Sequence, residues 1–529
     1  MKKAIILMLA LITLTGVGSV NQVAAIPYVV IAAVIIVTAL IALDKIDGRC
    51  YPIYIYGLAL ALLWQTSMLG SYIVGADIHG EFFAANKAII GGWDLGYVST
   101  GNTSLALGGL SQLLAKLGIG LVWQFKVLYP AMFAIVPVIL YLAYSRMVGA
   151  KRGYFAVMFF AVTPVFFVEV VGIAKSMIAE VFLAALVLLV VVNIKSWKRI
   201  LSISGVTVLA SLCHYTIGLL MIIYLIGGLL TLLIGKVIRL KCLRGEHLSL
   251  KYSSLIVVVT LASAFLWFSN VADGRMIDNY IHVGKCVVGS VGILFESPLE
   301  MVEPEVAEPE VVEPEVVEPE VIEPVIIVSE VIEPVIIAPE VIEPEVVEPE
   351  VIPPVIIEPE VIEPVIIVPE VIEPTIIEPV IIELEVIEPE VIVPEIIVPE
   401  LSYLYKQEPL VKTAIGLDFG DATTGGKGFR VLQYTMQLFL VLGGIYFLLR
   451  YKRYKFTTDF ASYVIVSFGL LGLCLFLPLF STIINASRFY HIALFFLAPI
   501  WVIGVEEVVR DVSRIASRTK VRIECLRKH

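Results

Sequence analysis

Long apolar runs dominate this chain and decide its surroundings. A helix needs roughly 20 mostly apolar residues to cross about 30 Å of hydrocarbon. Twelve candidate runs lie at 4–20, 27–43, 53–72, 126–145, 153–172, 177–194, 200–214, 216–235, 253–270, 432–449, 461–480 and 489–508. We therefore expect an all-α membrane protein with about twelve transmembrane helices. The first run follows Lys2 and Lys3, so it also fits a cleaved signal peptide.

Composition agrees with lipid as the main solvent. Only 16% of the residues are charged, against about 25% in soluble domains. The net charge of −11 comes from one segment, because residues 301–400 hold 28 Glu and no Lys, Arg or Asp. Removing those 28 negative charges from −11 leaves +17 for the rest of the chain. These basic residues form short clusters between apolar runs, which does not indicate nucleic-acid binding. The six cysteines show no C-x-x-C spacing, so no zinc site is indicated.

The basic clusters predict the orientation in the membrane. Lys and Arg favour cytoplasmic loops. With the N-terminus inside, 26 of the 37 basic residues fall in inside segments, each of which holds at least two. We expect a multi-pass protein of the plasma membrane, with both termini cytoplasmic. Residues 73–125 and 271–431 are then extracellular.

Four regions follow from this reading. They are an N-terminal membrane body (1–300), a repeat (301–400), a C-terminal membrane part (401–508) and a basic cytoplasmic tail (509–529). In the tail, Arg510, Arg514 and Arg518 are four residues apart, so a helix would align them in one stripe. We expect that stripe to lie against anionic headgroups.

The repeat has a period of five residues, with units such as EPEVV and EPVII. Of its 20 register positions, only Ser329 and Leu384 are not proline. Proline at this spacing prevents an α-helix, and an odd period moves the apolar residues from one face of a strand to the other. We expect an extended, polyproline-like insert of about 300 Å at ~3.1 Å per residue. It is either a spacer that contacts a cell-envelope layer or a low-complexity insertion without a specific role.

The loop after the third run carries an acidic motif. Asp77, His79 and Glu81 are two residues apart in the segment GADIHGEF. An extended segment would place all three on one side, whereas a helix would place Asp77 and Glu81 on one face at i, i+4. In both cases two carboxylates can converge just outside the membrane.

Two further polar points lie on the same predicted face. His214 and Tyr215 occupy a tight turn between two apolar runs, and Arg488 begins the last run with His491 beside it. A cation at that depth is costly unless it meets an anion or water. An Arg that holds phosphate and carboxylates that act as a base or as metal ligands suit a reaction on a lipid-linked phosphate. The simpler alternatives are solvated loop acids, a helix-capping His214 and an interfacial Arg488.

These features carry a family resemblance. An acidic motif in the first large external loop of a many-span body resembles the GT-C superfamily of glycosyltransferases. The segments YPIYIYGLALALLWQTSMLGSYIVGADIHGEF, LCHYTIG, AIGLDFGDA and RFYHIALFFLAP are similar to an uncharacterised archaeal family of membrane proteins, usually grouped with that superfamily. The resemblance covers most of the chain outside the repeat.

The resemblance implies a GT-C-like fold and the transfer of a sugar from a polyprenyl-phosphate-linked donor at the outer face. Asp77 then matches the superfamily's catalytic base or metal ligand, with Glu81 as the second candidate and Mg²⁺ or Mn²⁺ as the metal. The candidate substrate-binding residues are His79, His214, Tyr215 and Arg488. The W-W-D-x-G motif of oligosaccharyltransferases is absent, which disfavours transfer to peptide asparagine.

Two other functions stay open. The protein could be a non-enzymatic envelope anchor that displays the repeat, although one span would suffice for an anchor. It could also be a transporter. The spans appear nearly free of buried ions and show no duplicated halves, which argues against transport. Convergence of the acidic loop, His214 and Arg488 on one cavity would favour the enzyme.

Overall fold

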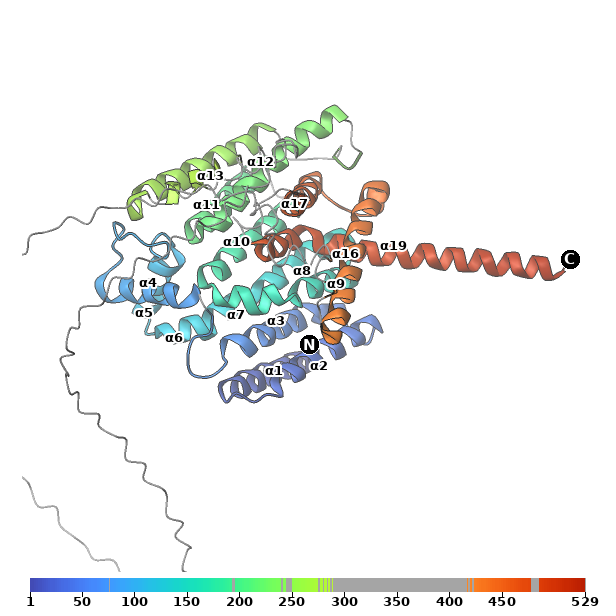
Figure 1. The fold of residues 1–529 in the computed structure, drawn as a ribbon, viewed down its shortest axis with the longest axis horizontal. Coiled ribbons are helices and arrows are strands. Elements are labelled where there is room, and N and C mark those ends of the chain that lie inside the picture. Colours follow the sequence, from blue (N-terminus) through green and yellow to red (C-terminus); the bar gives the residue numbers. More distant parts are fainter. Residues whose placement is uncertain are drawn as a thin grey trace, which may run out of the picture. The chain divides into compact units, whose positions relative to one another are not determined.

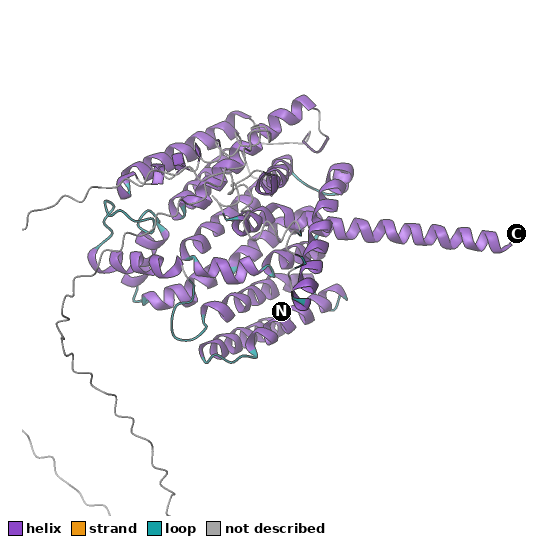
Figure 2. Ribbon diagram, in the orientation of Figure 1, coloured by secondary structure: helices purple, strands orange, loops and turns teal. Residues whose placement is uncertain are grey.

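The part of the chain that the structure describes is built from helices and contains no strand (Figures 1 and 2). The structure is a computed structural model. It describes residues 1–75, 77–192, 196–238, 241–243, 250–274, parts of 276–288, 416, 419–420, 423–476 and 485–528. The chain divides into one unit formed by Met1–Pro298 and Val398–His529 and a second formed by Leu299–Ile397. The second unit holds nearly all of the repeat and lies outside the described residues, so the extended rod stays a prediction.

The expected apolar runs coincide with helices. The N-terminal half contains α1 (Lys2–Val20), α2 (Ile26–Ala42), α3 (Tyr51–Ser67), α4 (Asp77–Gly91), α5 (Ser111–Lys116), α6 (Leu121–Trp123), α7 (Tyr129–Phe133), α8 (Ile135–Val148) and α9 (Ala150–Ala161). These are followed by α10 (Ala174–Val191), α11 (Ser196–Cys213), α12 (Tyr215–Ile238), α13 (Leu250–Asn270), α16 (Thr424–Arg450), α17 (Thr458–Phe476) and α19 (Ala486–Lys528). The acidic loop thus folds into the separate helix α4, outside the long apolar segments.

The number of helices that can cross a membrane is lower than expected. Among the described residues, eight are long and apolar enough, and nine if the bent pair Ala150–Ala161 and Val165–Gly172 is one span. The expected count of twelve is therefore too high by this measure. Helices α2 and α3 have 17 residues each and rise only about 26 Å. Helix α11 carries Lys198 and Arg199 in its first turn, which makes it too polar. Crossing by these three helices stays a prediction.

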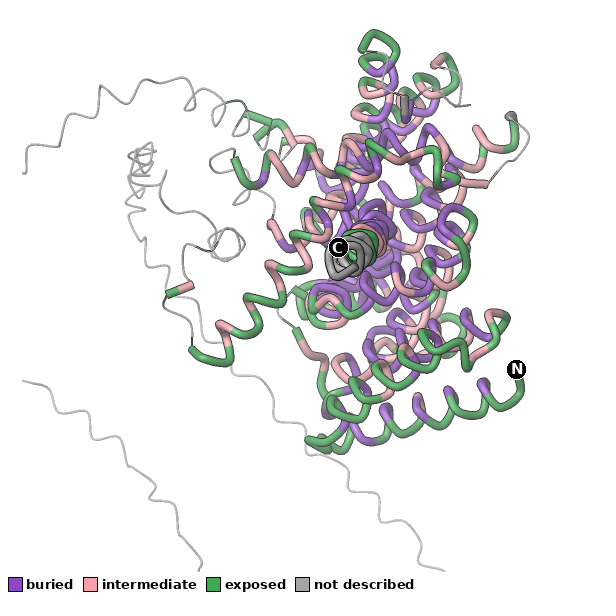
Figure 3. The backbone as a smooth tube through the Cα atoms, turned by 90° about the vertical axis from the view of Figure 1, so that its right-hand side faces the viewer, coloured by how far each residue is buried: buried purple, intermediate pink, exposed green. Residues whose placement is uncertain are grey.

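Helix α19 runs through the buried centre of the bundle. Its residues Ile492 to Ile503 are almost all buried, and Figure 3 shows buried residues concentrated around this helix, which is seen end on. Helix α16 crosses it very closely. A Cβ atom added at Gly443 would lie 2.1 Å from the carbonyl oxygen of Ile500, and one at Gly504 would lie 2.0 Å from that of Phe439. Glycine at both positions therefore lets the two backbones touch.

The span that contains α9 is broken near the acidic helix. Helix α9 ends at Ala161, and after a break at Thr163–Pro164 the chain continues as a π-helical turn (Val165–Glu169) and a 3₁₀ turn (Val170–Gly172), bent by 57° from α9. Proline is a common cause of such a bend because it lacks a backbone donor. The break brings Glu169 and the start of α10 to the same region as α4.

Candidate functional site

Three polar contacts, one between each two of the helices α4, α10 and α19, join these helices in a closed ring. The ring consists of Asp77 and Glu81 from α4, Lys175 and Glu180 from α10, and Arg488 and His491 from α19. Arg488 Nη2 lies 3.0 Å from Asp77 Oδ2, Lys175 Nζ lies 3.2 Å from Glu81 Oε1, and His491 Nε2 lies 2.8 Å from Glu180 Oε2. We call these six residues the three-helix ring. It brings together segments that are up to 411 residues apart.

The Asp77–Arg488 pair is the exposed side of the ring. The Asp77 side chain is 59% exposed and that of Arg488 is 34% exposed. Asp77 is the first residue of α4, where a negative charge interacts favourably with the helix dipole. The expected interfacial Arg488 thus meets an anion, which is one of the two conditions that stabilise a cation at this depth.

The loop before Asp77 is held from two sides. Gly75 has a φ of +126°, and a Cβ there would lie 3.0 Å from Gly172 Cα in the broken span. The ammonium of Lys126 donates to three carbonyl oxygens of the same loop, those of Leu69, Gly70 and Tyr72, at 3.4, 3.0 and 2.5 Å. These contacts restrict where Asp77 can lie.

Glu81 is buried and caps a helix. Its residue is 3% exposed, and Oε2 accepts a hydrogen bond from the backbone N–H of Lys175 at 3.2 Å, in the first turn of α10. A carboxylate at this place satisfies a free donor and the positive end of the helix dipole. Burial raises the pKa of Glu81, and the nearby Lys175 ammonium only partly offsets that effect. Glu81 is therefore not a solvated loop charge.

His79 is not part of the ring. Because α4 is helical from Asp77 onward, the expected alternative of an extended segment with three side chains on one side is wrong. Asp77 and Glu81 share a face, as the helical alternative predicts, and His79 is exposed two residues from each.

His214 and Tyr215 lie beside the ring. His214 Nδ1 accepts hydrogen bonds from the backbone N–H groups of Thr216 and Ile217 at 3.1 and 3.3 Å, which confirms the capping alternative. Burial lowers the pKa of His214, and the charges of Lys175 and Arg488 lower it further. The imidazole of His214 is therefore neutral, with its proton on Nε2.

Tyr215 links His214 to the three-helix ring. Its aromatic ring stacks on that of His214 with centroids 5.3 Å apart, and Lys175 Nζ lies 5.4 Å from the Tyr215 centroid. That distance is within reach of a cation–π interaction. The acidic loop, His214 and Arg488 therefore come together in one polar cluster, although no single cavity is seen to join them among the described residues.

Sequence reasoning did not assign the buried half of the ring. The side chains of Glu180 and His491 are 2% and 1% exposed, and Ser176 donates to Glu180 Oε1 at 3.1 Å. The expectation that the spans hold almost no buried ions is therefore wrong. One signal was present in the sequence, since a single Glu inside the apolar run 177–194 marks a functional position by default.

A second polar cluster surrounds Glu507, near the middle of the 43-residue helix α19. The Glu507 carboxylate accepts from Arg453 at 3.0 Å and Tyr454 at 2.8 Å, and also from Arg450 and Arg510. Its neighbours Glu506 and Asp511 bind further arginines. We call this the Glu507 cluster.

The Glu507 cluster changes the expectation for the C-terminal tail. Arg510 pairs with Glu506 and Glu507 instead of facing headgroups, so the expected stripe is wrong at that position. Arg514 is 57% exposed and lies 3.3 Å from Asp511. The side chain of Arg518 lies outside the described residues.

The expected metal site has no support from neighbouring ligands. No group of three or more His, Cys, Asp or Glu side chains in the described part of the chain could hold a metal ion. Asp77 and Glu81 are each paired with a cation instead. Binding of Mg²⁺ or Mn²⁺ by these two carboxylates stays a prediction.

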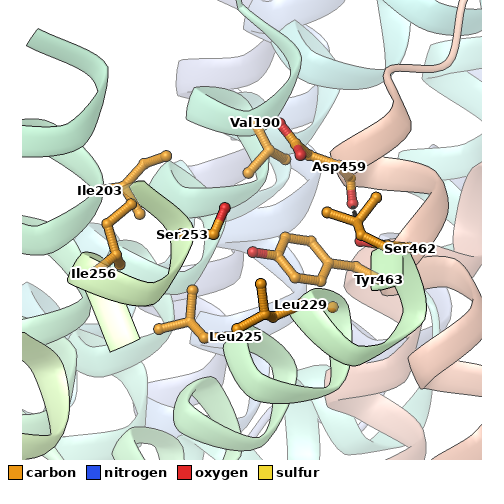
Figure 4. A pocket seen from close by; sticks show the side chains of 11 residues that line it. Val190, Ile203, Leu225, Leu229, Ser253, Ile256, Asp459, Ser462 and Tyr463 are labelled. Carbon is orange, nitrogen blue, oxygen red and sulfur yellow. Dashed lines mark hydrogen bonds between the residues drawn. The ribbon is translucent and has the colours of Figure 1, made fainter. Parts of the chain in front are cut away.

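A small cavity lies away from the ring, near the other end of α10 (Figure 4). It has a volume of about 30 Å³, and its polar lining comes from Tyr463, Ser253, Ser462 and Asp459. That volume holds about two water molecules. Arg199 pairs with Asp459 at 2.7 Å. The cavity is too small for a sugar and does not include any expected site residue.

The helices and their polar contacts define a multi-pass helical membrane protein. Residues 421–526 match the model of a family described as "Predicted membrane protein (DUF2206)", so this part of the chain is similar to that family. The match includes Arg488 and His491 but neither α4 nor α10. No curated protein and no solved structure matches the chain. The expected likeness to the GT-C superfamily stays a prediction.

Proposed function

We propose that this protein transfers a sugar from a polyprenyl-phosphate-linked donor at the outer face of the plasma membrane. The observation that supports the proposal best is the exposed pair of Asp77 and Arg488, which lies beside a second cation, Lys175. One carboxylate and two cations in a small region are the groups that such a transfer requires.

The cations would bind the donor phosphate. A guanidinium matches phosphate oxygens with two parallel N–H groups, and an ammonium adds a point charge. Because the pair with Asp77 is partly exposed, breaking it costs little. A phosphate can therefore replace Asp77 on Arg488. The neutral His214 can supply a further N–H donor from Nε2.

Asp77, once released from Arg488, would act as the base. The acceptor hydroxyl attacks the anomeric carbon, the bond from that carbon to the phosphate oxygen breaks, and the phosphate leaves with the bonding electrons. Asp77 accepts the proton of that hydroxyl and so acts as a general base. If the reaction uses Mg²⁺ or Mn²⁺, Asp77 and Glu81 are its expected ligands.

The remaining candidates have supporting parts. Glu81 holds Lys175 and the first turn of α10, so it positions a cation. Tyr215 lies against the same ammonium. His79 is exposed near Asp77 and would contact the sugar or the acceptor.

Charge and length support the proposed placement at the outer face. Arg488 and Glu507 are 19 residues apart on α19, which is about 28 Å along a helix. That distance is close to the thickness of the hydrocarbon. Since the Glu507 end carries many arginines, it is the expected cytoplasmic end. The ring and the repeat are then extracellular, where the repeat would meet the cell-envelope layer.

Three variants in one assay test the proposal. Asp77→Asn keeps the size of the side chain and removes its charge, so sugar transfer to an acceptor should be abolished while the protein stays folded and inserted. Asp94→Asn, an exposed position in the same region, is the matched control and should keep full activity. Deletion of residues 301–400 should also keep activity. Transfer that survives in Asp77→Asn but is lost on deleting the repeat would favour the anchor function.

A transporter is the second candidate because of the ring's buried half. A broken span and the buried Glu180–His491 pair are features of transport proteins as well. Proteoliposomes that take up a sugar phosphate without forming a glycosylated product would favour transport. Formation of the product without net uptake would favour the transferase.

A further inference from the structure

The charges of the ring do not balance. Among the described residues, the carboxylates in and around it are Asp77, Glu81, Glu169 and Glu180. The side chains that carry a positive charge at neutral pH are those of Lys175 and Arg488. Glu169 joins them because it accepts a hydrogen bond from Ser487, one residue before Arg488. Burying net negative charge is expensive, so such a cluster favours the uptake of protons.

His491 and Glu180 are the most deeply buried members of the cluster. His491 Nδ1 is buried and has no hydrogen-bond partner, while Nε2 lies 2.8 Å from Glu180 Oε2. The rings of Phe160 and Phe495 lie 4.9 and 5.8 Å from the imidazole. A proton held between His491 and Glu180 is therefore shielded from bulk solvent.

The polar and aromatic groups around this pair come from several elements. Helix α9 contributes Phe160, the π-helical turn contributes Phe166 and Glu169, α10 contributes Lys175 and Ser176, and α19 itself contributes Ser487 and Arg488. The charged contacts that α16 and the 3₁₀ turn η10 (Tyr451–Arg453) make with α19 lie in the Glu507 cluster, 19 residues along α19 from Arg488. The charged residues that these elements carry in and around the ring, apart from the pair itself, are Glu169, Lys175 and Arg488.

We propose that the His491–Glu180 pair binds a proton when an anion occupies Lys175 and Arg488, so that anion binding at the ring is coupled to proton uptake. This rests on the proposed function for the choice of a phosphate as the anion. A bound phosphate adds negative charge and frees Asp77 from Arg488, which increases the negative potential at the pair. By linkage, a proton on the pair strengthens phosphate binding by the same factor.

Calorimetry of the full-length protein in detergent micelles tests the coupling. The probe is a short-chain prenyl monophosphate, titrated in two buffers of different ionisation enthalpy to obtain the protons taken up per anion. We expect the unmodified protein to take up about one proton more than His491→Gln, and its affinity to fall up to about tenfold more per pH unit as the pH rises. The ionisation of the probe contributes equally for the unmodified protein and for His491→Gln, so it cancels from the difference in proton uptake between them.

Two further variants make the result decisive. Glu180→Gln should lose the extra proton as well, and it carries the test if His491→Gln does not fold. Glu506→Gln removes a carboxylate of the Glu507 cluster, away from the ring, and should keep the extra proton. Anion binding with equal proton uptake in the unmodified protein and both ring variants would overturn the coupling and leave the proposed function intact. Absence of anion binding in all four proteins would overturn both.

Discussion

The stretch of α19 from Arg488 to Glu507 holds polar clusters of opposite character at its two ends. At the Glu507 end, one fully buried carboxylate accepts from three arginines and a tyrosine, so all of its bonding capacity is used. At the ring end, Arg488 Nε and His491 Nδ1 are buried without a hydrogen-bond partner, and Asp77 is more than half exposed. A saturated cluster holds helices together, whereas an unsaturated one retains donors and acceptors for a ligand.

The largest effect should come from breaking the saturated end. Glu507→Gln leaves four donors around a neutral side chain, and removing one partner of a buried ion pair costs about 3 kcal/mol. We expect a large drop in the midpoint of thermal unfolding in detergent, and loss of activity because the fold is lost. Asp77→Asn should leave the same midpoint nearly unchanged, because its pair is exposed. Equal destabilisation by the two variants would remove the distinction between the ends.

A slightly smaller effect is expected where α16 joins the Glu507 end. Gly443→Ala places a methyl group 2.1 Å from the Ile500 carbonyl oxygen, so the helices must separate at a cost of about 1–3 kcal/mol. Helix α16 carries Arg450, which belongs to the Glu507 cluster and not to the ring. Gly443→Ala should therefore lower the unfolding midpoint more than it lowers the affinity for an anion at the ring. Gly428→Ala in the same helix has no atom within 4 Å of the new carbon and serves as the control. An unchanged unfolding midpoint for Gly443→Ala would contradict the close crossing.

At the ring end, Glu81 should make the free energy of unfolding depend on pH. Burial raises its pKa above 4.5, so the folded protein holds this proton more tightly than the unfolded chain does. As the pH rises from about 4.5 through the raised pKa, the protein should lose up to about 1.4 kcal/mol per pH unit relative to Glu81→Gln. The unfolding midpoints of both proteins, measured from about pH 4 to about pH 8, give this difference. Parallel curves would mean that Glu81 is ionised in the fold as easily as in water.

The smallest effect is expected at the exposed margin of the Glu507 cluster. The Arg514 side chain is 57% exposed and pairs with Asp511 only at 3.3 Å. Exposed pairs of this kind contribute about 0.5 kcal/mol or less. Arg514→Gln should therefore leave both the unfolding midpoint and sugar transfer unchanged within error. A large loss would show that the saturated cluster extends farther along the tail than its contacts indicate.

The helices and one face of the site followed from local sequence. Apolar runs predicted the positions of the long helices, because lipid requires each backbone to satisfy its own hydrogen bonds. The i, i+4 spacing of Asp77 and Glu81 predicted their shared face on a helix, and the structure has that helix. The expected count of twelve exceeds the eight or nine helices that pass by length and composition among the described residues, because α2 and α3 have only 17 residues each and α11 begins with two charges.

What only the tertiary structure decided is which charges meet. Asp77 pairs with Arg488 across 411 residues, and Glu180 pairs with His491 across 311. No local pattern encodes such partners, since they depend on how α4, α10 and α19 pack. The same packing makes Glu81 a buried helix cap and leaves His79 in solvent, although both belong to one short motif. Burial changes the energy of a charge far more than residue type does, and burial is set by packing and not by local sequence.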